Sequence, residues 1–224
     1  KAETFAARAI ALMCACAIDM TTATGDAAWR ARAAFLTPIT KAFGTDTGIK
    51  VASMGVQVHG GMGFVEETGA AQYLRDVRVT AIYEGTNGIQ AMDLVARKLM
   101  DGGDAARLLI EEIQTGAEAA RSTHADLAEV VWQAAEDLRE TTDWLVAQTD
   151  LQQRFAGAVP YLAAFARVLG GHAHLAAAIH GDTARARLAT FYIKRLLPDV
   201  TGLLTQVREG SDDLLAISPD DLAA

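Results

Sequence analysis

Only four prolines interrupt this chain of 224 residues, and apolar residues recur along it at steps of three and four. Proline breaks helices, whereas alanine, the most abundant residue here, is the easiest to fix in one. Steps of three and four place side chains on one face of a helix. Two such seams are Leu127, Val131, Ala134, Leu138, Thr141, Leu145 and Ala158, Leu162, Phe165, Leu169, His172, Ala176, Ile179. The pattern predicts an all-α fold of antiparallel, bundled helices with no sheet of three or more strands.

The turn Asp101-Gly102-Gly103 predicts a boundary between two helical domains, residues 1–102 and 103–224. The expected elements are a helix over Phe5–Met20, a second from near Ala27 that Thr37-Pro38 interrupts or kinks, a short helix over Ala70–Asp76, an extended β-branched stretch over Val77–Tyr83, a helix over Ile89–Met100, four more helices within 104–209 and a loosely packed tail over Ser211–Ala224.

Charge and hydropathy exclude several classes of protein. The formal net charge is −8 and no run of Lys or Arg occurs, which argues against a nucleic-acid partner. Apolar residues make up 51% of the chain, which argues against disorder. The nearest approach to a membrane span, Phe155–Gly181, contains Arg167, two glycine sites, a proline and three histidines, so a buried bundle helix is the better interpretation. We expect no membrane span, and a soluble, cytoplasmic fragment of a longer protein.

Neither the cysteines nor the histidines form a metal-binding pattern. On a helix Cys14 and Cys16 point about 200° apart, so they do not bridge each other. No histidine or carboxylate stands beside them at zinc-ligand spacing, and we expect two buried, reduced thiols and no metal. His172, His174 and His180 are interpreted as residues of the bundle interior or its rim.

A glycine-rich segment, Gln57-Val58-His59-Gly60-Gly61-Met62-Gly63, is chemically unusual. Three glycines in four positions do not form a stable helix interior. The segment follows a predicted helix and not a strand, so it is not the dinucleotide fingerprint. Its glycines either let backbone N–H groups approach an anion such as a pyrophosphate or simply end the helix.

A second segment, Ile82-Tyr83-Glu84-Gly85-Thr86-Asn87-Gly88, places a carboxylate between an apolar stretch and a glycine. In an apolar cavity Glu84 would be a stronger base, able to accept a proton from weakly acidic carbon. Gly85 would let substrate or backbone pass close by, and Thr86 is a candidate N-cap for the next helix. The alternative is that Glu84 is a solvated loop residue.

Together these segments resemble the acyl-CoA dehydrogenase family. The resemblance is carried by Gly55–Phe64, by Arg75-Asp76 and by Ile82–Thr86, and it covers roughly residues 1–100, the later part of that family's C-terminal helical domain. Glu84–Gln90 and the helices after Gly103 resemble a long subgroup that includes enzymes similar to 3-methylmercaptopropionyl-CoA dehydrogenase. Residues 103–224 are then an appended helical domain.

The resemblance implies a role for each matched residue. Glu84 corresponds to the base that removes the proton α to the thioester carbonyl, while the β-hydrogen leaves as hydride to FAD. Gly85 corresponds to a position that lines the acyl group. The positions that correspond to FAD contacts are Thr86, Asn87 and Gly88 and, toward the FAD of a neighbouring subunit, Gln57, Val58, His59, Gly60 and Gly61.

The implied partners are an acyl-CoA substrate, electron-transfer flavoprotein and further copies of the chain. The family's N-terminal helical domain and middle β-domain are missing, so we expect the isolated chain to be inactive. Two other functions stay open, a helical oligomerisation module without activity and an acyl-CoA oxidase. The acyl chain stays undetermined, because most residues that would set the depth of its pocket are absent.

Overall fold

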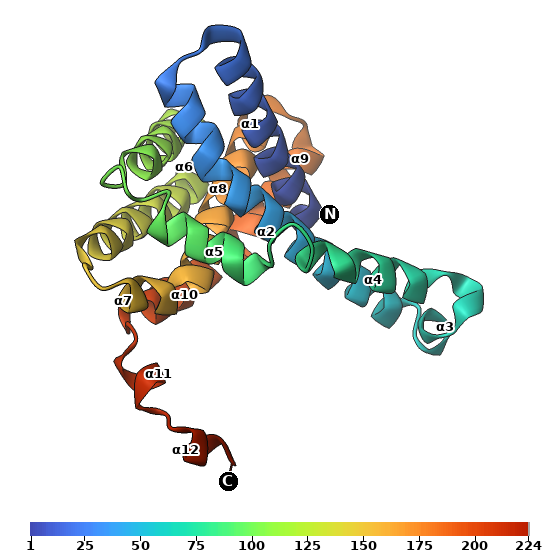
Figure 1. The fold of residues 1–224 in the computed structure, drawn as a ribbon. Helices are drawn as coiled ribbons and strands as arrows, with labels where there is room; N and C mark the ends of the chain where they lie inside the picture. Colours follow the sequence, from blue (N-terminus) through green and yellow to red (C-terminus); the bar gives the residue numbers. More distant parts are fainter. Residues whose placement is uncertain (224) are drawn as a thin grey trace.

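The computed structural model describes residues 1–223, and no strand occurs among them. The predicted all-α fold is therefore confirmed (Figure 1). The elements, with η marking a 3₁₀ turn, are α1 (Ala2–Thr24), α2 (Ala27–Val58), α3 (Gly61–Phe64), η1 (Glu66–Thr68), α4 (Ala70–Arg78), η2 (Val79–Ala81), α5 (Asn87–Ala96), α6 (Asp104–Ala147), α7 (Leu151–Ala156), α8 (Ala158–His180), α9 (Thr183–Arg195), α10 (Asp199–Arg208), α11 (Asp212–Ala216) and α12 (Pro219–Ala223).

Helix α8 lies at the centre of the body and packs against α1, α2 and α5 on one side and against α6, α9 and α10 on the other. Its apolar side chains belong to one buried cluster that draws on both halves of the chain. Phe165 of α8, for example, meets Phe35 of α2 edge to face, with ring centroids 4.9 Å apart. The two predicted domains therefore share a core, and the predicted boundary near Gly102 lies in the turn between α5 and α6.

The first turn of α1 is attached to α8 by polar contacts. Arg167 of α8 donates a hydrogen bond to Glu3 at 3.0 Å, and Lys50 of α2 donates to the same carboxylate oxygen at 2.6 Å. Burial opposes the charge on Glu3, yet the hydrogen bonds from Lys50 and Arg167 lower the pKa of this carboxyl. The buried His174 lies with Nε2 3.1 Å from the carbonyl oxygen of Ala2, and its ring stacks on Tyr192.

Acid is expected to weaken the fold through two of these α8 histidines. Burial lowers the pKa of His172 and His174 below the usual imidazole value of about 6.5. Below that pH the unfolded chain binds protons that the folded chain does not, so the free energy of unfolding falls, by at most about 1.4 kcal/mol per pH unit for each histidine.

Urea unfolding at several pH values between 5 and 8 measures how steeply the free energy of unfolding changes with pH. The double variant His172→Gln/His174→Gln should flatten it, whereas His180→Gln, at an exposed position, should leave it unchanged. A slope that the double variant does not reduce would contradict this account.

A projecting arm extends from the body in Figure 1. We define the arm as residues 48–81, which comprise the last part of α2, then α3, η1, α4 and η2. The buried residues of α2 end at Thr47, and α4 has none. Several large apolar side chains on the arm are exposed: Val51, Met54, Val58, Met62, Phe64, Tyr73 and Val79. An arm with so little buried surface is the part of the fold that most needs further contacts.

Two local predictions fail wholly or in part. The expected interruption of α2 at Thr37-Pro38 does not occur: the helix continues through Pro38, the proline is buried, and Thr37 Oγ1 donates to Ala33 O at 2.7 Å. Residues 77–81 are helical instead of extended: α4 continues to Arg78, and η2 follows. Val77 packs against Gly48 of α2, and Thr80 Oγ1 donates to Val77 O at 2.6 Å. Tertiary packing thus overrides the strand preference of the β-branched residues.

The second half also departs from expectation in detail. Residues 104–209 contain five helices, α6 to α10, instead of four. The longest, α6, bends at His124, whose backbone is not helical (φ −140°, ψ 51°). Cys14 is buried as expected, but Cys16 is exposed because the face of α1 that carries it is not covered. Of the predicted loose tail, Ser211 is buried, all side chains from 212 to 223 are exposed, and Ala224 lies outside the described residues.

Helices α1 and α8 are long and apolar enough, by length and composition alone, to cross a membrane. Most of the apolar stretch of α8 is buried inside the bundle, as the interpretation of Phe155–Gly181 as a core helix requires. Helix α1 packs along α2. Exclusion of a membrane span remains a prediction.

Candidate functional site

The loop that carries Glu84 has an unusual backbone. We call residues 82–86, between η2 and α5, the Glu84 loop. Glu84 has φ 54°, the only positive φ of a non-glycine residue among residues 1–223, and Gly85 follows with φ 82°. A left-handed conformation costs a residue with a Cβ roughly 1–2 kcal/mol. Such strain persists only where surrounding contacts impose it, and it concentrates at functional sites.

Glu84 itself is exposed, as are the apolar side chains of Ile82, Tyr83 and Ile89 around it. The apolar cavity considered for this carboxylate is therefore not formed by the described residues of this chain. Within residues 1–223 no hydrogen bond uses the backbone N–H of Glu84. The loop thus presents a carboxylate, a free N–H donor and an apolar rim outward together.

The residues after Glu84 begin α5. Thr86 is the N-cap of α5, and its Oγ1 accepts a hydrogen bond from the N–H of Ile89 at 3.4 Å, as the sequence predicted. The Asn87 amide is turned toward α2, where its Nδ2 donates to Thr45 Oγ1 at 2.9 Å and to Asp46 Oδ1 at 2.7 Å. Gly88 is exposed. Of these three predicted cofactor contacts, Asn87 has its side chain committed to the fold, and only its backbone is available to a ligand.

The glycine segment lies at the far end of the arm. Helix α2 ends at Val58, and His59 folds back so that its Nδ1 lies 2.8 Å from Gly55 O. Gly60 has φ 61°, and a Cβ built on Gly60 or Gly61 would meet nothing within 4 Å. Gln57, Val58, His59, Gly60 and Gly61 are all exposed. The backbone here is bare and open, as close approach of a phosphate-bearing ligand requires.

The two predicted groups of site residues are not brought together. Figure 1 places α3 at the tip of the arm, whereas α5 returns to the body. One group is the Glu84 loop with Asn87 and Gly88, and the other is 57–61. Between them Arg75 pairs with Glu66 at 2.8 Å on the exposed surface of the arm. A pairing at this exposure contributes little to stability.

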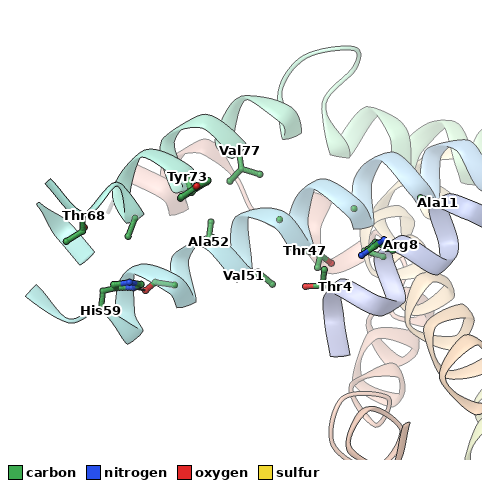
Figure 2. A pocket seen from close by; sticks show the side chains of 15 residues that line it. Thr4, Arg8, Ala11, Thr47, Val51, Ala52, His59, Thr68, Tyr73 and Val77 are labelled. Carbon is green, nitrogen blue, oxygen red and sulfur yellow. Dashed lines mark hydrogen bonds between the residues drawn. The ribbon is translucent and has the colours of Figure 1, made fainter. Parts of the chain in front are cut away.

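A groove that the sequence did not predict runs along the arm, from its base toward its tip. Figure 2 shows it between α1, α2 and α4, with Tyr73 and Val77 on one side and Thr4 and Arg8 toward one end. Its volume is about 690 Å³, and His59 and Thr68 lie at the other end. Its lining from α2 is rich in small residues: Gly44, Gly48, Ala52 and Gly55. Their spacing of three and four was the signal in the sequence. Glu84 does not line this groove.

A second groove, of about 680 Å³, adjoins the start of α5 and is formed by both halves of the chain. Asn87 and Gly88 line it beside Lys50, Arg167 and Asp199. No group of three or more metal-ligating side chains occurs within residues 1–223.

Each half of the chain matches a model of a known protein family. Residues 2–100 match the family model for the acyl-CoA dehydrogenase C-terminal domain, and residues 109–218 match the model described as acetyl-CoA dehydrogenase C-terminal like. The chain is 36% identical over 208 residues to the 3-methylmercaptopropionyl-CoA dehydrogenase of Ruegeria pomeroyi, covering 83% of this chain and 35% of that protein. It is 28% identical over 189 residues to the butyryl-CoA dehydrogenase of Syntrophomonas wolfei, covering 74% and 30%.

Solved structures share the fold. The crystal structure of Caenorhabditis elegans ACDH-11 in complex with C11-CoA aligns with a TM-score of 0.74 at 20% identity, covering 86% of this chain and 34% of that one. An acyl-CoA dehydrogenase complexed with FAD from Bacillus anthracis aligns with a TM-score of 0.62 at 18% identity, covering 99% and 42%. The chain spans about a third of the length of the curated relatives it matches.

Proposed function

The chain belongs to the acyl-CoA dehydrogenase family, as part of its C-terminal helical region, and from this we propose that Glu84 is the base of a flavin-dependent acyl-CoA dehydrogenation. The observation that carries the proposal is the left-handed, exposed Glu84, in a segment that resembles the family's active-site segment and lies within the residues that match its C-terminal domain model. The activity is that of a longer protein in which this chain is the C-terminal part.

The chemistry follows from the groups that the Glu84 loop presents. A carboxylate oxygen of Glu84 takes the proton from the carbon α to the thioester carbonyl, and the electrons of that C–H bond move toward the carbonyl oxygen. The α-proton is weakly acidic, so the negative charge developing on that oxygen needs a hydrogen-bond donor. The unpaired N–H of Glu84 is such a donor. Gly85, which has no side chain, leaves room for the acyl group beside it.

FAD is the cofactor of the proposed reaction, and it supplies the acceptor for the β-hydride. We propose that two parts of this chain contact the edge of the bound FAD. One is the start of α5, where Thr86, the backbone of Asn87 and Gly88 are open. The other is 57–61 on the arm, which in our proposal reaches the FAD of a second copy because it lies apart from the Glu84 loop. Bare, exposed glycine backbone at Gly60 and Gly61 supports this assignment.

The proposed reaction also implies partners. They are an acyl-CoA substrate, electron-transfer flavoprotein as the acceptor of electrons, and further copies of the chain, in the cytoplasm. The exposed apolar side chains of the arm support assembly with other copies. An acyl-CoA oxidase would use the same base and differ in the access of oxygen to the reduced flavin. A helical oligomerisation module is the alternative if Glu84 has no role in catalysis.

The isolated chain is expected not to retain FAD. The chain supplies two separated segments that would contact FAD and no enclosed cavity around Glu84. Most of the surface that would bury a flavin is therefore absent. The purified chain should be mixed with FAD and passed through a gel-filtration column while absorbance is recorded at flavin wavelengths. We expect the flavin to elute with the small molecules. Stoichiometric flavin eluting with the protein would contradict this expectation.

A further inference from the structure

We propose that Lys41 and Gln90 are positioning residues for Glu84, which bind the two successive carbonyl oxygens of the Glu84 loop and hold its left-handed turn. The inference rests on the proposed function in one respect, that Glu84 is the base. It concerns two residues to which the resemblance assigns no role, one of them, Lys41, 44 positions from the carbonyl oxygen that it binds.

Lys41 reaches the loop from α2. Its ammonium donates to Gly85 O at 2.8 Å and to Asn87 Oδ1 at 2.8 Å. The side chain is half-buried, and no carboxylate of residues 1–223 lies within ion-pair distance of it. A cation whose bonds all go to the loop and the first residue of α5 is placed to fix the loop, because charge-assisted hydrogen bonds are stronger than neutral ones.

Gln90 reaches the same loop from the first turns of α5. Its Nε2 donates to Glu84 O at 3.1 Å, across the turn from the contact made by Lys41. A Cβ built on Gly85 would lie 3.1 Å from this nitrogen. Glycine at 85 therefore serves both the φ of 82° and the close approach of the Gln90 amide.

The two contacts act on the peptide units that follow Glu84 and Gly85, so they lie on either side of Gly85. Glu84 contributes the first carbonyl and Gly85 the second, so the backbone of the base is held from two helices at once. Without these contacts the φ of Glu84 is free to relax to the ordinary negative range, which would carry both its carboxylate and its N–H away from their positions. A misplacement of about 1 Å is enough to slow an enzyme by around 100-fold.

A purely structural role is the competing explanation, because Lys41 also helps to attach α5 to α2. The Asn87 amide also has bonds to α2 that do not involve Lys41, to Thr45 and Asp46. Loss of Lys41 is therefore expected to free the loop more than it weakens the fold. Two quantities therefore test the proposal: the mobility of the Glu84 loop and the rate of flavin reduction.

Cleavage of the chain by a glutamate-specific protease measures the mobility of the Glu84 loop directly. Glu84 and Glu67 are both exposed, so the ratio of cleavage after Glu84 to cleavage after Glu67, read by mass spectrometry, is an internally referenced measure of loop mobility. We expect Lys41→Met to raise this ratio at least about ten-fold, and Gln90→Leu to raise it several-fold. Lys50→Met, on the same helix but bonded to Glu3, should leave it unchanged. Circular dichroism confirms that each variant is folded.

Catalysis is measured in the full-length protein with FAD bound. Lys41→Met should lower the rate of flavin reduction by acyl-CoA at least about ten-fold while changing the Kd for acyl-CoA less than about three-fold. An unchanged cleavage ratio in both variants would show that Lys41 and Gln90 do not hold the Glu84 loop. A raised ratio with an unchanged rate of flavin reduction would show that holding the loop does not matter for catalysis. If the Glu84→Gln variant reduces its flavin normally, Glu84 is not the base, and Lys41 and Gln90 then cannot be positioning residues for it.

Discussion

Replacing Glu84 with Gln in the full-length protein is expected to slow flavin reduction by acyl-CoA by a factor of about 10²–10⁴, the usual contribution of a general base. Gln keeps the shape and the hydrogen-bonding capacity of the side chain but has no basic oxygen able to hold the proton. Binding of FAD and of acyl-CoA should persist. Stopped-flow bleaching of the flavin absorbance under anaerobic conditions measures the rate.

Glu67→Gln is the matched control for this variant. Glu67 is an exposed glutamate in η1 on the arm, and the same chemical change there should alter the rate less than about two-fold. Near-normal flavin reduction in the Glu84 variant would remove the base assignment and leave the family membership intact. Equal losses in both variants would point to a general electrostatic effect instead of a base.

Replacing Phe165 with Ala is expected to lower the free energy of unfolding of the chain by about 3–5 kcal/mol, the range for truncating a buried aromatic side chain. Phe165 is fully buried in the first half of α8 and meets Phe35 of α2 and Tyr161 edge to face. The cavity would open where the two halves of the chain meet. Urea unfolding followed by circular dichroism gives the change.

Phe191→Ala is the control, because Phe191 is 52% exposed on α9. Its loss should cost less than about 0.5–1 kcal/mol. We also expect a single unfolding transition for the whole chain, since one core joins both halves. Two separate transitions, with Phe165→Ala shifting only the later half, would show that the halves are independent domains.

Local patterns in the sequence predicted much of this structure. The seam in 127–145 indicated the buried face of α6, and the seam in α8 indicated buried positions as far as Leu169, whereas its later members His172, Ala176 and Ile179 are only partly buried. The glycines at 60, 61 and 63 indicated where α2 ends. Thr86 as N-cap followed from the preference of hydroxyl residues for that position. Each of these features depends on residues within a few positions of one another.

The features that the sequence did not reveal depend on distant residues. The helical state of 77–81 comes from packing on α2, and the residues around Pro38 did not indicate that α2 continues through this buried proline. Lys41 lies 44 positions from the carbonyl oxygen of Gly85 that it binds, and nothing in its own neighbourhood indicates that contact. The exposure of Cys16 depends on which face of α1 the rest of the protein covers.

Exchange of the substrate α-hydrogen with solvent tests the role of Glu84 most directly, because it reports proton removal without requiring hydride transfer. Full-length protein with FAD bound is incubated anaerobically with an acyl-CoA in D₂O, and deuterium at the α-carbon of the recovered substrate is measured by mass spectrometry. If Glu84 is the base, the unaltered protein deuterates the α-carbon rapidly and the Glu84→Gln variant does so at least about 100-fold more slowly. Deuteration by that variant at the rate of the unaltered protein would contradict the assignment of Glu84 as the base.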